Sequence, residues 1–490
     1  MSAYVREKEL SNGTTVIQVE FKDGRRRVGL KHVGTAHNEV ELKLLRDEAQ
    51  KIKLGGQLYF DFAKPKESVA KLLRAYSQTL WDALEGEYDK LGFGHLDDKI
   101  FRQLVLARII EPASKLDTIR ILDGLGLDSP SNTAIHRCLK RVAYNQYREI
   151  VSSICFRYCH PDSLAVVLYD VTTLYFEIDR EDEYRIPGYS KERRLDPQIA
   201  LGLLVNSEGY PLEIQSFEGN KGEVKTIIPV LNSFRQRHGL IDITVAADAA
   251  MLSAKNIAEL EVLGYNYIIG SKLDKTPYGI EISLKEGVEL TDGQIIEAPK
   301  SITLNGRHVN RREIFQYKKK RAARDLKNID KTLGKAQRIV SGEVPLKNNR
   351  FLKITADKRE IHTEILEEAK KRAGVKGYLT NLDIPPQQVI DYYHQLHHVE
   401  KSFRMSKSDL KARPVFHHER DSIEAHLTIV LTALALSRHI EAKSGLSIRK
   451  FVNTLEPIKT GVIMIGKQIM PAEPNITDKI ATLLQKLRNT

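Results

Sequence analysis

SLAVVLYD at residues 163–170 is a continuous apolar run that ends in an acid, Asp170. Further apolar or alternating runs follow in the same region: IALGLLVN (199–206), YPLEIQSF (210–217), ITVAAD (243–248) and NYIIGSK (266–272). Helical patterns separate the last three runs, and ITVAAD again ends in an acid, Asp248. Three strands in succession, followed by alternating helices and strands, predict a mixed α/β sheet.

The composition restricts the class of protein. Hydrophobic residues make up 41% of the chain and charged residues 29%, which fits a soluble globular protein and excludes wholesale disorder. The 76 Lys and Arg exceed the 64 Asp and Glu, so the net charge is +12. A basic excess of this size favours a polyanionic partner, with nucleic acid ahead of a membrane surface.

The sequence also indicates the cellular compartment. Only three Cys occur, Cys138, Cys155 and Cys159, which excludes a disulfide scaffold and suits a reducing interior. The N-terminus has no apolar segment of the kind found in signal peptides. The longest apolar run, residues 425–436, is too short to cross a bilayer and predicts a buried core helix. We therefore expect a soluble cytoplasmic protein with no membrane partner.

Changes in pattern divide the 490-residue chain into six expected regions. They are an N-terminal β-hairpin and helix (1–55), a helical region (56–150), an α/β region (151–272), a β-rich basic insertion (273–375), a second α/β part (376–440) and a C-terminal helical tail (441–490). In the first region, Asp-Gly separates two alternating runs, and Asn38 is a plausible N-cap for the helix that follows.

Two short helical patterns in the second region, residues 114–124 and 132–142, leave two interpretations open. One is a helix-turn-helix that reads DNA, with Arg137, Lys140 and Arg141 facing the groove. The other is a pair of packing helices with a solvated basic face, and it is favoured because the motif is weak without a known turn geometry.

The insertion contains most of the chain's excess positive charge. Between residues 307 and 353 there are 15 Lys and Arg against 4 Asp and Glu, a net charge of +11. Runs of charge are often solvated helix faces. This concentration within an already basic protein favours a surface that contacts phosphate backbones, centred on Lys318, Lys319 and Lys320.

The two acids that end apolar runs are candidate metal ligands. A carboxylate at the end of a buried strand is held rigidly at the rim of the sheet. Asp170 and Asp248 on neighbouring strands would offer the hard oxygen ligands that Mg²⁺ prefers. For either acid alone, a turn or N-cap role is an equally good interpretation.

A third acid begins a line of cations on a predicted helix, residues 392–414. From Glu400, Arg404 lies four residues on, Lys407 seven and Lys411 eleven, and these offsets share one helix face. A surface ion pair between Glu400 and Arg404 would explain only the first of these cations. The longer line fits a metal ligand flanked by phosphate-binding side chains better.

Several long strings resemble insertion-sequence transposases of the DDE type, specifically the YREK-motif group. They are LYDVTTLYFE (168–177), the segment that begins with GYSKERRLDPQIALG (188–226), AADAAMLS (246–253), KKKRAARD (318–325) and YHQLHHVEKSFRMSKSDLKARPVFHHERDSIEAHL (393–427). The resemblance covers most of the chain. It implies a ribonuclease H-like mixed sheet with helices on both faces, interrupted by a mostly β insertion, and an α-rich N-terminal region.

The resemblance also implies the site residues. Asp170, Asp248 and Glu400 match the catalytic acids that hold two Mg²⁺ ions, which Mn²⁺ can replace. The expected DNA contacts are Tyr393, Arg404, Lys407, Lys411, Lys318, Lys319, Lys320 and Arg321. The family's Arg four residues before the Glu is Leu396 here, a departure that Arg404 or a nearby His would have to compensate.

The implied function is cut-and-paste transposition. The protein would bind the terminal inverted repeats of an insertion sequence as a homodimer on double-stranded DNA, in the nucleoid of a prokaryotic cell. It would then catalyse strand cleavage and strand transfer. An alternative is a catalytically inactive, transposase-derived DNA-binding protein. A haloacid-type phosphatase is disfavoured, because Thr172 stands where that class needs a second acid.

Overall fold

The computed structural model describes residues 2–488 except 12, 54–69, 160–165, 178–180, 189–195, 250–252, 272, 274–275, 286–287, 305–306, 356–357, 414, 416, 418 and 466–467. The chain divides into two compact units. One comprises Met1–Lys71 with Met464–Ile469, and the other comprises Leu72–Ile463 with Met470–Thr490.

The N-terminal unit is a three-stranded antiparallel sheet covered on one face by a helix. Its elements are β1 (Ser2–Glu9), β2 (Thr15–Asp23), β3 (Arg26–Ala36) and α1 (Glu39–Lys53). The predicted hairpin between β2 and β3 and the helix are confirmed, whereas β1 was not expected. Asn38 caps α1 as predicted, because its Oδ1 accepts the Glu41 backbone N–H at 2.9 Å.

A helical region follows the residues between 54 and 69, which lie outside the described structure. Its helices are α2 (Gln78–Lys90), α3 (Lys99–Ile110), α4 (Lys115–Gly124), α5 (Asn132–Tyr144) and α6 (Tyr147–Tyr158). The expectation of helix is wrong at Lys71–Tyr76, which forms strand β4 and joins a three-stranded sheet with β15 (Thr460–Ile465) and β16 (Gln468–Ala472). The C-terminal part adds α15 (Ile448–Leu455) and α16 (Asp478–Arg488).

The centre of the larger unit is an eight-stranded mixed sheet with the strand order β10-β11-β14-β9-β8-β5-β6-β7. Its strands are β5 (Val167–Tyr175), β6 (Gln198–Asn206), β7 (Pro211–Glu218), β8 (Thr244–Ala247), β9 (Asn266–Ser271), β10 (Ile295–Leu304), β11 (Arg307–Tyr317) and β14 (Val375–Thr380). Strands β5, β8 and β9 are parallel to one another, and the remaining pairings are antiparallel. The predicted mixed α/β sheet is confirmed.

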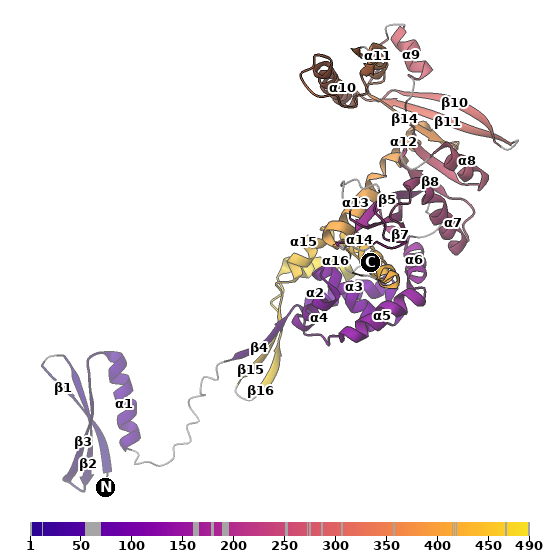
Figure 1. Cartoon of the computed structure of the whole chain (residues 1–490). Helices are drawn as coiled ribbons and strands as arrows, with labels where there is room; N and C mark the ends of the chain where they lie inside the picture. Colours follow the sequence, from indigo (N-terminus) through magenta and orange to yellow (C-terminus); the bar gives the residue numbers. More distant parts are fainter. Residues whose placement is uncertain are drawn as a thin grey trace. The chain divides into compact units, whose positions relative to one another are not determined.

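Helices cover both faces of this sheet (Figure 1). On one face lie α7 (Ile227–His238) and α8 (Ala254–Val262), whose apolar side chains pack against β5, β8 and β9. On the other lies α14 (Arg420–Ser444), which also packs against α3, α5 and α6. Among the described helices, α14 alone is long and apolar enough to span a membrane, yet 89% of the 18-residue window that meets this test is buried inside the protein. The predicted core helix is thus confirmed.

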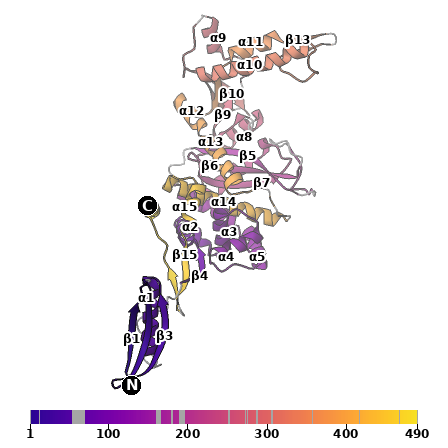
Figure 2. The same cartoon turned by 90° about the vertical axis from the view of Figure 1, so that its left-hand side faces the viewer.

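The insertion between β9 and β14 is not mostly β. Its hairpin, β10 and β11, extends the central sheet, and the rest contains α9 (Tyr278–Lys285), α10 (Lys319–Val340), α11 (Thr363–Lys371) and two short strands, β12 (Leu352–Ile354) and β13 (Arg359–Ile361). Figure 2 shows α10 and α11 side by side. Within the part of the insertion expected to be β-rich, α9 forms a helix, and the Pro277 carbonyl accepts the Ile280 and Glu281 N–H groups at its start.

Candidate active site

Asp170 lies within a strand rather than at its end. Strand β5 continues to Tyr175, because β6 pairs with it along its whole length. The parallel neighbour β8 pairs only with Val167 and Leu168, so Asp170 lies just beyond the end of that pairing. The expectation that the strand ends at Asp170 is therefore wrong. Asp170 nevertheless lies at the rim of the parallel strands, as expected. Asp170 is half-buried, and its Oδ1 accepts the Val171 N–H at 2.8 Å.

Asp248 directly follows β8, as the sequence predicted. Its side chain is exposed, and Oδ1 accepts two hydrogen bonds, from the Ala249 backbone N–H at 2.7 Å and from the Tyr393 hydroxyl at 3.0 Å. Both donors hold the carboxylate in one orientation at the carboxyl end of the strand.

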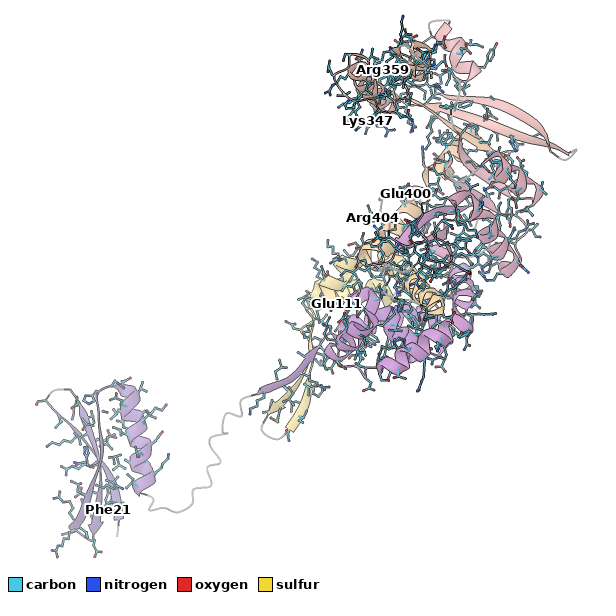
Figure 3. The ribbon with its side chains drawn as sticks, in the orientation of Figure 1. Phe21, Glu111, Lys347, Arg359, Glu400 and Arg404 are labelled. Atoms are coloured by element: carbon cyan, nitrogen blue, oxygen red, sulfur yellow. The ribbon has the colours of Figure 1, made fainter. Side chains whose placement is uncertain are left out.

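Glu400 lies on a short helix, α13 (His397–Arg404), that is separated from α12 (Pro386–His394) by a break in the chain's helical path. The side chain is exposed, and Figure 3 shows it on the same short helix as Arg404. Within the part of the chain that the structure describes, no ion pair joins Glu400 to Arg404. The interpretation of Glu400 as one half of a surface ion pair is therefore wrong.

The three acids line one cavity of about 310 Å³. The cavity's other lining residues are Tyr169, Lys376, Tyr393, His394, Leu396, His397 and Val399. Carboxylate oxygens are the ligands that Mg²⁺ and Mn²⁺ prefer, so the donor set fits a hard divalent cation. Within the described residues, no three acidic, His or Cys side chains are already close enough to hold an ion together. Like charges in one cavity repel each other until a cation lies between them.

Lys376 also lines the cavity, although no sequence pattern pointed to it. It lies on β14, half-buried between the buried residues Val375 and Gly377, and its side chain reaches the cavity that holds the acids. Its Nζ lies 4.1 Å from the centroid of the Tyr393 ring. Burial, together with the charge of Arg321, lowers the pKa of Lys376 to about 8, although Asp248 opposes this shift. A lysine within an apolar strand gave no distinctive signal in the sequence.

Tyr393 is buried and positions Asp248. Burial and the negative charge of Asp248 raise the pKa of the phenol far above its usual value, so the hydroxyl remains protonated and donates. Gly270 on β9 allows this contact, since a Cβ there would lie 2.6 Å from the Tyr393 hydroxyl oxygen. The contact of Tyr393 with a DNA phosphate stays a prediction, and in this structure its hydroxyl donates a hydrogen bond to Asp248, a candidate metal ligand.

The three predicted cations do not form one line. After Arg404 the chain forms a π-helical turn (Met405–Asp409), and Lys411 has φ 43°, so the helical spacing is lost. The buried guanidinium of Arg108 explains this ending, because it donates to the Leu410 and Lys411 carbonyls at 3.1 and 3.2 Å.

Because the chain is not a continuous α-helix after Arg404, the side chains of Arg404 and Lys407 reach different parts of the protein. Arg404 lines a different cavity, with Lys401 and Glu441. Lys407 contacts the strand of the first acid, donating to the Oγ1 of Thr172, which shares a sheet face with Asp170.

The predicted basic tract lies at the start of α10. Lys318 is the N-cap residue, and Lys319, Lys320 and Arg321 form the first turn. The Arg321 Nε lies 3.5 Å from the Asp325 carboxylate. Burial, with the charges of Lys376 and Lys318, lowers the pKa of His394, a cavity residue. The start of α10 therefore extends the positive field of the cavity.

Known proteins share sequence and structural features with this chain. A family model described as "Transposase DDE domain" matches residues 161–436. No curated protein matches. Solved structures with some similarity are a piggyBac transposase synaptic complex with hairpin DNA and two Mos1 transposase complexes, one a paired-end complex with the left transposon end and one a pre-cleavage transpososome.

These structural similarities are low. The piggyBac structure shows 12% identity and a TM-score of 0.36 over 78% of this chain and 68% of that chain. The Mos1 paired-end complex shows 16% identity and a TM-score of 0.16, over 46% of this chain and 66% of that chain. The pre-cleavage Mos1 structure shows 14% identity and a TM-score of 0.15, over 46% of this chain and 67% of that chain. The family model, in contrast, covers more than half of the chain and spans all three acids, and the chain therefore belongs to the transposase DDE-domain family.

Proposed function

We propose that this DNA transposase binds the terminal inverted repeats of an insertion sequence and catalyses strand cleavage followed by strand transfer. The observation that carries the proposal is the cavity at the rim of the central sheet, which is lined by Asp170 of β5, Asp248 just after β8 and Glu400 of α13. Family members act with divalent metal ions, and the three carboxylates provide a suitable donor set.

The carboxylates would hold two Mg²⁺ ions, for which Mn²⁺ could substitute. When bound, such ions stabilise the attacking and leaving oxygens of an in-line phosphoryl displacement. Tyr393 and the Ala249 N–H orient Asp248 for this role, and Val171 N–H orients Asp170. Water would attack the phosphodiester at an element end and release a 3′-hydroxyl, which would then attack a target phosphodiester and displace its 3′-oxygen.

Cations around the cavity would bind the DNA backbone. Lys376 lies within the cavity, where its ammonium can contact a phosphate next to the bond that is cut. Lys407 lies beside Asp170 through Thr172, and Lys318 to Arg321 extend the positive surface along α10. In this arrangement Lys376 supplies the charge that Leu396 does not.

Two further features of the proposal follow from the reaction. Two DNA ends must be brought together for transposition, so we propose a homodimer in the complex with DNA. We also propose that the protein acts on genomic DNA in the cytoplasm of a prokaryotic cell, associated with the nucleoid.

Cleavage assays on DNA with the inverted repeats that flank the gene test the function. Asp170→Ala, Asp248→Ala and Glu400→Ala should each abolish Mg²⁺-dependent cleavage but bind the same DNA in EDTA like the wild type. Asp242→Ala, an exposed acid just before β8, is the matched control and should cut normally. Normal cutting by Glu400→Ala would exclude it as the third ligand, and a wild type that binds without cutting would favour the inactive alternative.

The basic tract is tested by the salt dependence of binding. Replacing Lys318, Lys319 and Lys320 with Gln should reduce the slope of log affinity against log salt by about 0.9 for each phosphate that the variant no longer neutralises. Lys327, Lys331 and Lys335, exposed and spaced along the same helix, provide a control triple of equal charge. An unchanged slope in the first triple would assign the tract to a solvated helix face.

A further inference from the structure

The N-terminal sheet has one covered face and one uncovered face. Ile17, Val19 and Phe21 of β2 point toward α1 and pack with its apolar side chains. Figure 3 labels Phe21 in this unit. Glu7 of β1 also faces the helix, where it forms an ion pair with Arg46 at 2.7 Å. Because side chains alternate along a strand, the intervening residues must lie on the opposite face.

The strand register defines this opposite face, which we call the outer face. Directly paired residues of antiparallel strands share a face. Across the three strands the pairings are Tyr4–Glu20–Leu30, Arg6–Gln18–His32 and, at the hairpin end, Lys22–Arg27. The contact of Lys22 Nζ with the Tyr4 ring, at 5.6 Å, agrees with this assignment. Tyr4 and Leu30 remain 52% and 44% exposed, so no helix or strand that the structure describes in this unit covers the outer face.

Charge separates the two sides of the unit. The outer face has four cations, Arg6, Lys8, Lys22 and Arg27, against a single acid, Glu20. Helix α1 on the other side is balanced, with Lys43, Arg46, Lys51 and Lys53 against Glu39, Glu41, Asp47 and Glu48. The outer face of the sheet is therefore the positive side of this unit, and the side that carries α1 is close to neutral.

We propose that the outer face of the N-terminal sheet binds duplex DNA, with the sheet lying in the major groove. The distance across three strands is two spacings of about 4.8 Å, or about 10 Å. The major groove is about 12 Å wide and admits β-strands as well as helices. Cations on the two outer strands, Arg6, Lys8 and Arg27, then lie where the phosphates border the groove, and Gln18 on the central strand faces the base edges.

This surface is separate from the catalytic cavity, which lies in the other unit. It also differs from the helix-turn-helix interpretation of residues 114–142. The inference depends on the proposed function only in that DNA is the substrate, and it does not require that the cavity be active. A module of this kind would recognise an element end while the cavity carries out the chemistry.

The test compares two triple variants of the full chain that have equal net charge. The outer-face variant is Arg6→Gln/Lys8→Gln/Arg27→Gln, and the control is Lys43→Gln/Lys51→Gln/Lys53→Gln on α1. All six side chains are exposed, so both variants should fold, which circular dichroism and thermal unfolding would check. Affinity for a short duplex with an element end is measured in EDTA over a salt series.

We expect the outer-face variant to bind about tenfold or more weakly, with a salt slope lower by about 0.9 for each phosphate that it no longer neutralises, and the control to bind like the wild type. Gln18→Ala should reduce the preference for the element end over an unrelated duplex. Equal weakening in both triples, an unchanged slope, or tighter binding to duplex RNA would overturn the inference. If the wild type cuts no DNA, the proposed function is refuted, but the binding measurements in EDTA still test this inference.

Discussion

Replacing Tyr393 with Phe removes one hydrogen bond and little else. Tyr393 is 7% exposed, its ring lies 5.1 Å from the Tyr378 ring, and Lys376 lies over its face. All of these ring interactions survive in Phe. Only the 3.0 Å hydrogen bond to Asp248 disappears. Because Asp248 is exposed and still accepts the Ala249 N–H, the free energy of unfolding should change by less than about 1 kcal/mol.

The effect on metal binding should be larger. A hydrogen bond to a charged acceptor contributes about 1.5–3 kcal/mol, and each 1.4 kcal/mol corresponds to about a tenfold change in an equilibrium constant. If the hydroxyl orients Asp248 as a ligand, Tyr393→Phe should raise the Mg²⁺ concentration for half-maximal cleavage about 10- to 100-fold. At saturating Mg²⁺ the rate should largely recover.

The assay is cleavage of a labelled element end over a Mg²⁺ titration, with DNA binding in EDTA measured in parallel. Tyr392→Phe is the matched control, because its hydroxyl accepts from Gln388 outside the cavity and its removal should not move the Mg²⁺ midpoint. An unchanged midpoint in Tyr393→Phe would refute the orienting role. Weaker DNA binding at an unchanged midpoint would instead support Tyr393 as a phosphate contact.

Three other perturbations have defined outcomes. Because the pKa of Lys376 is lowered to about 8, its charge is lost as pH rises through 8, so DNA affinity should fall above that pH in the wild type but not in Lys376→Arg, as a binding titration would show. Gly270→Ala should displace the Tyr393 ring and raise the Mg²⁺ midpoint as Tyr393→Phe does. Glu87, which is 2% exposed and bonded to His439 at 2.7 Å, has its pKa lowered to about 2 by its hydrogen bonds to His439 and Lys90, which outweigh burial. Its stabilisation should be lost as pH falls from about 4.5 toward 2, and Glu87→Gln should lower the free energy of unfolding in urea by about 3–5 kcal/mol.

Much of the central sheet could be predicted from the sequence. The strands between 167 and 271 are apolar runs bounded by turn residues, so their residue patterns agree with the fold. The sequence KLLRAY at Lys71–Tyr76 fits the period of a helix as well as that of a strand, and the expected helix there is wrong. It forms a strand because β15, nearly 400 residues later, pairs with it, and such a non-local pairing leaves no local signal.

The acids of the candidate site could be predicted from local sequence patterns, whereas its cations depend on contacts between distant parts of the chain. Asp170, Asp248 and Glu400 were identified from strand ends and from a resemblance, and they do line one cavity. The cations do not share one helix face because the chain leaves the α-helical path after Arg404, in a π-helical turn that ends where Arg108, from a distant helix, donates to the Leu410 and Lys411 carbonyls. Lys376 was missed because its role depends on which strand β14 adjoins, namely β9, next to β8 and Asp248.

The position of bound Mn²⁺ is the most direct test of whether the three acids form one metal site. Crystals of the full chain soaked in Mn²⁺ should give an anomalous difference peak in the cavity, about 2.0–2.6 Å from carboxylate oxygens of Asp170, Asp248 and Glu400. Asp248→Ala crystals treated in the same way should lose the peak. A Mn²⁺ peak that contacts none of these residues, or one that contacts Asp170 and Asp248 while Glu400 remains outside the coordination sphere, would contradict this assignment.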